Sequence, residues 1–266
     1  MMAQPERSDG TVGKALDVLD QVAGFDRPVR FSELLSHSDY PKATLYRLLQ
    51  TLTHQELVSF DSERQTYSLG MRLVRLAHSA WRHSSLAPMA RSQIDALAGE
   101  VGETVHLAQL DHGQVLYVDK RNAASPVDMF SQAGKVGPVY CTGVGKAMLA
   151  FSGQAQQMQV IAQQSFHPFT PNTLVSAEAL RSELEHIRAR GYAFDNEEHE
   201  AGIICVALPI LSQTAQVMGG VSVTSTTARH NLATLAALVP RIQSTVDEIA
   251  KEAQNWRFPE QIPATV

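Results

Sequence analysis

The sequence predicts an α+β protein of two domains, a winged helix-turn-helix followed by a domain of mixed helices and strands. The chain has 266 residues and is 44% hydrophobic, which fits two globular cores better than one. Residues 11 to 70 show three short helical patterns and then an alternating hairpin pattern, whereas helical and strand patterns mix from residue 86 onward. We therefore expect domains at 11–70 and 86–255, joined by a linker helix over 71–85.

The composition excludes several classes of protein. The chain lacks a run of about 18 apolar residues, and its start, MMAQPERSDG, has no apolar core behind a basic flank, so we expect a cytoplasmic location. Its two cysteines, Cys141 and Cys205, are too few for a disulfide scaffold or a four-thiolate zinc site. A net charge of −5 argues against a protein that coats nucleic acid indiscriminately.

One stretch departs from this acidic average. From Arg64 to Arg91 the chain holds no aspartate or glutamate. The basic side chains and histidines of this stretch are Arg64, Arg72, Arg75, His78, Arg82, His83 and Arg91. A concentration of positive charge of this kind is typical of a surface that meets an anionic partner.

The first two helices of the predicted winged helix have clear apolar stripes. Between Thr11 and Gly24, apolar residues recur at helical spacing, and Gly24 follows the last of them. A second short helix is expected after Ser32 as N-cap, with Leu34 and Leu35 facing inward, and it ends in the polar turn 36–40.

The third helix, PKATLYRLLQTL, has the properties of a recognition helix. Pro41 suits a first helical turn, and Leu45, Leu48, Leu49 and Leu52 form one apolar face. The opposite face has short side chains near its N-terminus for close approach, and donors that reach base edges or phosphates in a major groove. The alternative is an ordinary amphipathic helix with a solvated outer face.

A hairpin follows this helix and completes the winged-helix pattern. Val58 and Phe60 alternate with polar neighbours, the turn runs from Asp61 to Gln65, and the strand pattern resumes at Tyr67. At the hairpin tip, Arg64 is expected either to contact the DNA backbone or minor groove or to be a solvated loop arginine. The candidate DNA-binding residues are Lys42, Ala43, Thr44, Tyr46, Arg47, Gln50 and Arg64. Residues 1 to 70 hold seven Lys or Arg against ten Asp or Glu, so affinity must depend on a local face and on dimerisation.

The linker and the second domain carry weaker signals. The linker is apolar at Leu73, Leu76, Ala77 and Ala80, and its arginines are expected to face DNA phosphates or a partner subunit, or else to be solvated. Strands are expected near 105–110 and 115–119, and a helix from Ser176 to Gly191 with Ser176 as its cap. The segment GVGKA at 143–147 lacks the earlier glycine of a phosphate-binding loop, and no GxGxxG is present, so we expect no nucleotide cofactor.

Two features of the second domain allow more than one interpretation. The segment DNEEHE is expected to be a solvated acidic loop, with a metal site of Asp195, Glu198 and His199 as the alternative. Cys205 lies in an apolar strand, where a small thiol normally packs; a nucleophilic role would need a base, and His199 has no recognisable third partner.

Several motifs in order along the chain resemble the IclR family of bacterial transcriptional regulators. They are PKATLYRLLQTL with a wing ending in YSLG, PVYCTGVGKAMLA, FTPNTL, RGYAFDNEEHEAGIICVALPI and GGVSVTSTTAR. The resemblance implies that the second domain is a GAF-like effector-binding domain of about six antiparallel strands flanked by helices. It also implies that the linker helps to pair the DNA-binding heads. Effector-pocket positions implied by the motifs are Gly143, Val144, Asp195, Cys205, Ser222 and Thr224.

The residues at these positions suit a small acid or carbonyl compound. The backbone around Gly143 can approach a ligand closely and donate N–H groups, while Ser222 and Thr224, two apart on one strand, point to one side. Met129 is either an apolar wall of this pocket or core filling. The family more often has a serine where Thr224 stands, and the added methyl narrows the expected pocket.

We therefore expect a sequence-specific transcriptional regulator rather than an enzyme, and a repressor rather than an activator. It would bind double-stranded operator DNA as a homodimer or a dimer of dimers, under control of a small organic-acid or carbonyl effector, without a metal or cofactor. The alternative is an α/β enzyme that uses Cys205 and carries a fused DNA- or protein-binding module.

Overall fold

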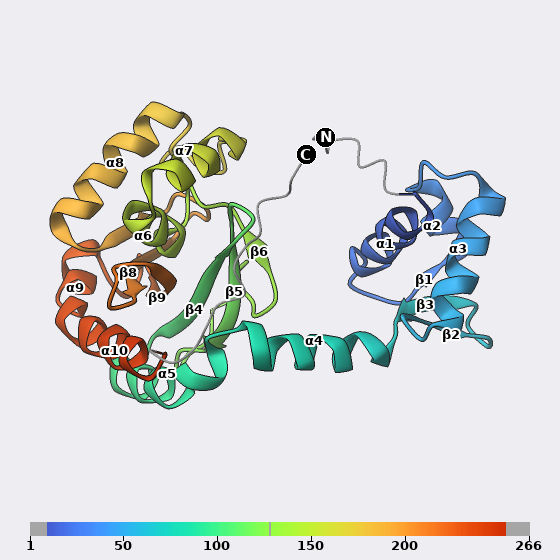
Figure 1. The fold of residues 1–266 in the computed structure, drawn as a ribbon, viewed down its shortest axis with the longest axis horizontal. Helices are drawn as coiled ribbons and strands as arrows, with labels where there is room; N and C mark the ends of the chain where they lie inside the picture. The colour runs from blue at the N-terminus through green and yellow to red at the C-terminus, as the bar shows by residue number, and fades with distance from the viewer. Residues whose placement is uncertain (1–9, 128, 254–266) are drawn as a thin grey trace. The chain divides into compact units, whose positions relative to one another are not determined.

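The computed structural model describes residues 10–127 and 129–253, except the side chains of residues 82–84. The end of the predicted second domain (residues 254–255) and the side chains of Arg82 and His83 lie outside this part. The chain divides into two compact units after residue 80, and we describe each by itself (Figure 1). Within the described residues, no helix is long and apolar enough to cross a membrane.

The first unit is a winged helix with a three-stranded sheet. Its elements in order are α1 (Gly10–Ala23), β1 (Val29–Arg30), α2 (Phe31–Ser36), α3 (Lys42–His54), β2 (Val58–Asp61) and β3 (Thr66–Leu69). The strands pair antiparallel in the order β1-β3-β2. The four leucines at 45, 48, 49 and 52 are all buried against α1 and the sheet, as the helical spacing predicts.

Two helix starts differ from the sequence prediction. The N-cap of α2 is Arg30, not Ser32, because the Glu33 carboxylate accepts the Arg30 N–H at 3.0 Å and also binds the Arg27 guanidinium. The short strand β1 therefore runs directly into the helix. Pro41 is the N-cap of α3 and precedes its first turn.

The helix α4 (Met71–Ser84) follows the wing, and the second unit then folds around one curled sheet. The helices of this unit are α5 (Ala87–Val101), α6 (Gly143–Phe151), α7 (Gln154–Gln163), α8 (Ala177–Arg190), α9 (Leu232–Ala236) and α10 (Val239–Glu252). The strands are β4 (Thr104–Asp111), β5 (Gln114–Arg121), β6 (Val136–Gly137), β7 (Ala193–Asn196), β8 (Ile203–Leu211) and β9 (Val217–Thr226). They form a six-stranded antiparallel sheet in the order β6-β5-β4-β9-β8-β7, which confirms the predicted α+β fold.

Helices cover both faces of this sheet, and each face has its own hydrophobic core. Figure 1 shows α5, α9 and α10 on one side and α6, α7 and α8 on the other. Because side chains alternate along a strand, Val221 and Val223 of β9 pack with α5 and α10. Ser222 and Thr224, which alternate with these two valines along β9, are also buried. They lie on the opposite face, which α6 covers.

Candidate functional site

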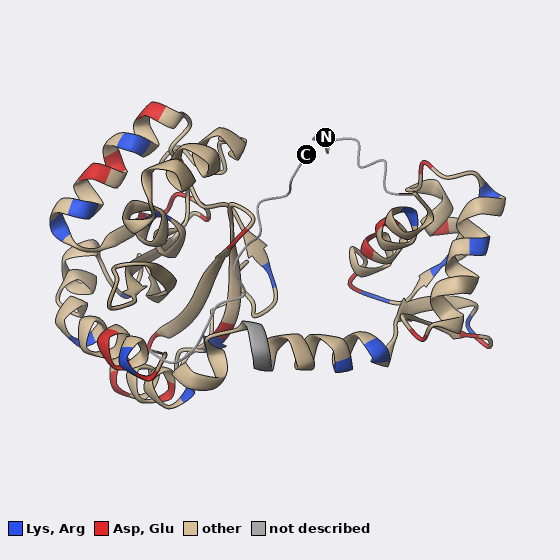
Figure 2. Cartoon of the chain, in the orientation of Figure 1, with Lys and Arg blue, Asp and Glu red and all other residues tan. Residues whose placement is uncertain are grey.

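The outer face of α3 is the candidate DNA-contacting surface. Five of its predicted residues are exposed, namely Lys42, Ala43, Tyr46, Arg47 and Gln50, while Thr44 is half-buried. Figure 2 shows basic positions along this helix. An open groove lies beside it, and it is lined on one side by Lys42, Tyr46 and Gln50 and on the wing side by Phe60 and Gln65. This accessible surface therefore offers the donors of Lys42 and Gln50 beside the rings of Tyr46 and Phe60, groups that can contact base edges in a major groove.

The wing arginine is almost free to move. The side chain of Arg64 is 82% exposed, and its guanidinium lies 3.9 Å from the Asp61 carboxylate. The turn itself is fixed by Asp61, whose Oδ1 accepts the N–H groups of Glu63 and Arg64 at 2.9 and 3.0 Å. An exposed ion pair of this kind contributes little energy, so Arg64 can exchange Asp61 for a phosphate.

Two linker arginines have a role that the sequence analysis did not include. Arg72 donates to the backbone oxygen and to Oε1 of Gln55, each at 2.9 Å. Arg75 lies 3.1 Å from the Glu56 carboxylate. Both partners lie in the turn that follows α3, so these arginines attach the start of α4 to the winged helix.

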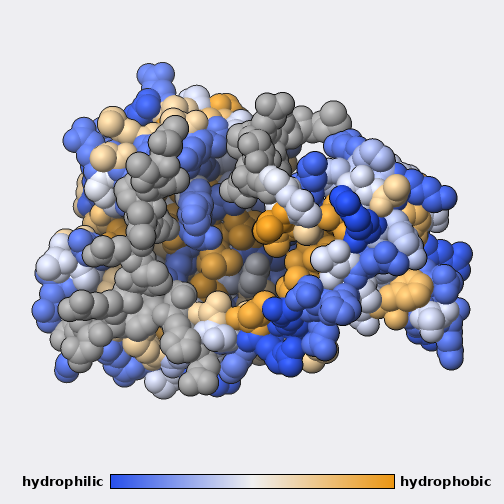
Figure 3. Space-filling view, turned by 45° about the vertical axis from the view of Figure 1, so that its right-hand side comes forward, coloured by the Kyte–Doolittle hydropathy of each residue, from blue (hydrophilic) through white to orange (hydrophobic). Residues whose placement is uncertain are grey.

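Large apolar side chains of the first unit remain exposed on two helices. They are Val12 and Leu16 of α1, and Met71, Val74 and Leu76 of α4, each more than half exposed. The space-filling view in Figure 3 shows hydrophobic atoms that reach the surface among hydrophilic ones. Exposed apolar side chains that recur at helical spacing, as in each of these two helices, are typical of a helix face that another protein covers.

The second unit contains a small polar pocket beneath α6. Six of the seven predicted effector positions line it, namely Gly143, Val144, Asp195, Cys205, Ser222 and Thr224. Met129 is buried but is not among the lining residues; its neighbours Phe130 and Ser131 form that wall instead. The cavity volume is about 30 Å³, room for about one or two water molecules.

Strand register and one glycine bring these residues together. Cys205 lies opposite Asp195 on β7 and opposite Thr224 on β9, and Ser222 lies opposite His106 on β4. The helix α6 begins at Gly143, where a Cβ would lie 2.4 Å from the Cys205 sulfur and 3.1 Å from the Asp195 nitrogen. Only glycine allows the helix N-terminus to approach the strands so closely. An approach of this kind favours a ligand that carries negative charge.

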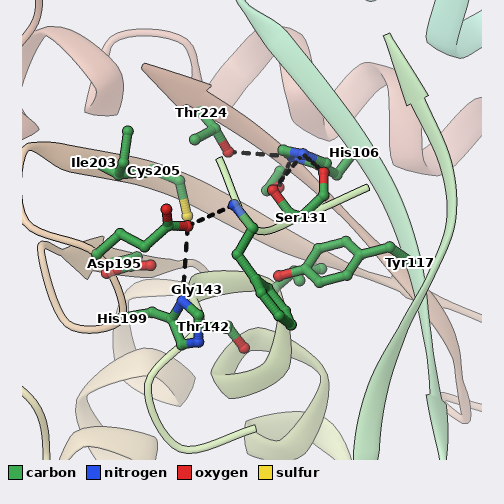
Figure 4. Close-up of a pocket in the computed structure, with 14 residues that line it drawn as sticks. His106, Tyr117, Ser131, Thr142, Gly143, Asp195, His199, Ile203, Cys205 and Thr224 are labelled. Carbon is green, nitrogen blue, oxygen red and sulfur yellow. Dashed lines mark hydrogen bonds and ion pairs between the residues drawn. The ribbon is translucent and has the colours of Figure 1, made fainter. Parts of the chain in front are cut away.

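His106 also lines the pocket, although nothing in its local sequence predicted this role. Its Nε2 lies 3.3 Å from the Ser131 carbonyl oxygen and 2.8 Å from Ser131 Oγ, and its Nδ1 lies 3.4 Å from Ser222 Oγ and 3.3 Å from Thr224 Oγ1 (Figure 4). Burial, with a smaller contribution from the charge of Lys120, lowers the pKa of His106 to about 3, so the ring is neutral.

The hydrogen bonds of His106 determine what the pocket offers a ligand. A carbonyl oxygen only accepts, so the ring proton is on Nε2 and Nδ1 is an acceptor. One lone pair on Nδ1 takes one hydroxyl proton. Only one of the hydroxyls of Ser222 and Thr224 can therefore donate its proton to Nδ1. The other hydroxyl has its proton available for an oxygen of a ligand.

The prediction of a solvated acidic loop is wrong for two residues of the segment DNEEHE, Asp195 and Glu198, which are buried. Glu198 is buried and forms an ion pair with Lys146 of α6; their side chains are 8% and 1% exposed. The Glu198 N–H also donates to Asp195 Oδ1 at 2.8 Å. The residue that reverses the prediction is Lys146, which lies 52 positions earlier in the chain.

The charge of Glu198 also affects Asp195. Burial and this neighbouring charge together raise the pKa of Asp195 to about 7. Within residues 10–127 and 129–253, no three potential ligands lie close enough to hold a metal ion, and Glu198 is already bound by Lys146.

The surroundings of Cys205 do not fit a nucleophile. The thiol is buried, and burial together with the charge of Asp195 raises its pKa, which opposes formation of the reactive thiolate. His199, the base considered from the sequence, lies between the rings of Phe130 and Phe169 at 4.9 and 4.6 Å. The geometry therefore favours binding over covalent catalysis.

Comparisons with known proteins agree with the two-unit organisation. The family model for the IclR helix-turn-helix domain matches residues 11–62, and the model for the bacterial transcriptional regulator IclR C-terminal matches residues 78–251. The HTH-type transcriptional regulator KdgR of Escherichia coli is 30% identical over 256 residues, which cover 96% of this chain and 97% of KdgR. The transcriptional repressor IclR of Escherichia coli is 28% identical over 81% of this chain and 80% of its own. A crystal structure of the Thermotoga maritima IclR matches with a TM-score of 0.75 and 27% identity, over 92% of this chain and 98% of that one.

Proposed function

The chain belongs to the IclR family of bacterial transcriptional regulators, and we propose on this premise that it is a repressor controlled by a small organic acid or related carbonyl metabolite. The observation that carries this proposal is the pocket beneath α6. It combines a helix N-terminus at Gly143, a spare hydroxyl proton from Ser222 or Thr224, and the carboxyl group of Asp195. These groups suit the oxygens of a carboxylic acid or carbonyl compound.

A second copy of the chain is the proposed partner for the apolar surface of α1 and α4. The winged helix has more acidic than basic residues, so one copy has little charge for DNA affinity. Two copies double the number of phosphate contacts and match a pseudo-palindromic operator. We propose a homodimer or dimer of dimers that acts in the cytoplasm, and repression is supported by the printed name of the related IclR repressor.

Binding to DNA is tested with a fragment from the gene's own promoter region against random DNA at several salt concentrations. Arg47→Ala is expected to weaken specific binding by about 5- to 150-fold and to relax specificity, as loss of a base contact does. Lys42→Ala is expected to weaken all sequences alike and to reduce the salt slope by about one. Arg181→Ala, on the exposed side of α8, is the matched control. Equal affinity of the unaltered protein for both DNAs at moderate salt would refute the proposal.

The effector class is tested by thermal shift with small carboxylates, aldehydes and aromatic acids. A ligand that binds only the folded state raises the melting temperature. The positive compounds are then added to the promoter complex, where they are expected to release the DNA. A compound that raises the melting temperatures of the unaltered protein and of a Ser222→Ala variant by the same amount does not bind at this site.

A further inference from the structure

One carboxylate is already bound at the edge of the pocket, and it belongs to the chain itself. Glu200 Oε1 accepts the backbone N–H of Phe130 at 2.9 Å and lies 3.7 Å from Nδ1 of His199. His199 contributes most, and the Phe130 N–H contributes further, to a lowered pKa of the Glu200 carboxyl. All three residues line the pocket. A backbone N–H and an imidazole that converge on one carboxylate form a receptor for an anion.

The exposure of Glu200 shows that this side chain is at the pocket mouth. Its side chain is 34% exposed, whereas His106, Ser222 and Thr224 are buried. The cavity of about 30 Å³ has room for about one or two water molecules, so a larger ligand needs space that a side chain at the mouth must give up. Glu200 already contacts water, and its carboxylate gains hydration when it turns outward.

We propose that the Phe130 N–H and His199 form an anion subsite, which Glu200 fills in the ligand-free protein and which the carboxylate of an incoming effector takes over. The assignment of that carboxylate to an effector rests on the proposed function; the subsite itself does not. The ligand class is a small monocarboxylate with a further oxygen that reaches the hydroxyls of Ser222 and Thr224.

Electrostatics favour an exchange over a simple addition. Asp195 is buried and lines the same pocket, so a further negative charge there is costly unless another one leaves. When the carboxylate of a ligand replaces that of Glu200, the net charge in the subsite stays the same. A neutral aldehyde or alcohol accepts these hydrogen bonds more weakly than a carboxylate does, so acids outrank carbonyl compounds as ligands.

The experiment restores the missing side chain with a small molecule. Glu200→Ala removes the atoms beyond Cβ, and acetate supplies them. Melting temperature is followed in the full-length chain with rising sodium acetate, at constant ionic strength set with sodium chloride. We expect a saturable rise for Glu200→Ala, with a dissociation constant on the order of millimolar, and a much smaller response for the unaltered chain. Acetamide, which is neutral, is expected to have no effect.

Two further variants make the outcome decisive. The neutral amide of Glu200→Gln competes with acetate less strongly than the carboxylate does. Its response to acetate is therefore expected to lie between those of the alanine variant and the unaltered chain. If Glu200→Ala does not fold, the comparison of Glu200→Gln with the unaltered chain tests the proposal. Glu197→Ala is the matched control, because its carboxylate accepts the Gly202 N–H at 2.7 Å and does not line the pocket.

The proposal is overturned if acetate stabilises all four proteins equally, if acetamide acts as well as acetate, or if neither Glu200 variant responds. These measurements contain no DNA. A failure to bind the promoter would therefore refute the proposed function and leave the subsite standing, and the reverse also holds.

Discussion

Removal of the buried lysine beneath the pocket is expected to destabilise the second unit strongly. Lys146→Met leaves the Glu198 carboxylate buried without its cation, and Glu198 Oε2 already has no hydrogen-bond partner. Breaking a buried pair by removing one partner costs about 3–5 kcal/mol. A domain of 150–250 residues changes its melting temperature by about 2–4 °C per kcal/mol, so we expect a decrease of about 6–20 °C.

Tryptophan fluorescence isolates this effect in the full-length chain. The two tryptophans, Trp81 and Trp256, both follow residue 80, the last residue of the first unit, so the winged helix contributes no tryptophan signal. Glu198→Gln alone leaves the ammonium unpaired, whereas Lys146→Met with Glu198→Gln removes both charges. The double variant is expected to lose about 2 kcal/mol less than the sum of the single variants. Lys251→Met, at an exposed position of α10, is the control and should change stability by less than about 0.5 kcal/mol. Additive losses, or a cost of Lys146→Met below about 1 kcal/mol, would refute the assignment of a buried ion pair.

Three other predictions use the same fluorescence assay. Gly143→Ala is expected to cost about 1–3 kcal/mol through overlap with Cys205, and a second substitution, Cys205→Ala, should recover part of this loss; no recovery would contradict the close approach. Because burial raises the pKa of Asp195 to about 7, the folded chain binds a proton more tightly there than the unfolded chain, and this contribution is lost as pH rises from about 4 through 7. The free energy of unfolding of Asp195→Asn should therefore rise relative to that of the unaltered chain over this pH range, and the difference between the two should be constant above it. A difference that does not depend on pH would contradict the raised pKa of Asp195. Ser176→Ala removes the hydroxyl that accepts the Ala179 N–H at 3.1 Å and should cost about 1 kcal/mol, which Ser182→Ala, at an exposed position of the same helix, should not.

The elements that the sequence predicted well are those specified by short-range patterns. The spacing of the four leucines of α3 places each side chain by its distance to the next few residues, and β4 and β5 lie where the sequence predicts strands. The cap of α8 at Ser176 is equally local. The predicted start of α2 was wrong because Glu33 binds both Arg27 and the Arg30 N–H. These contacts outweigh the preference of Ser32 for the N-cap position.

The pocket required information over longer distances. His106 comes from a strand whose apolar residues gave no sign of a polar function, and only its register with Ser222 reveals it. Lys146 lies in an apolar helix and is separated by 52 positions from its acid. An acidic segment is normally solvated, because an unpaired carboxylate is costly to bury. One lysine reversed that expectation for Glu198, and no local pattern contains both residues.

The position of α4 restricts how a ligand can act on DNA binding. Arg72 and Arg75 attach its first turns to the winged helix, and near its end the indole N–H of Trp81 donates to the Val118 carbonyl of β5 at 3.3 Å. The residue before Val118 is Tyr117, which lines the pocket and packs against His106 at 5.4 Å. A ligand alters DNA binding only if its contacts differ between two arrangements of the chain. Tyr117 and Val118 are adjacent on β5, so this strand contacts both the pocket and the end of α4.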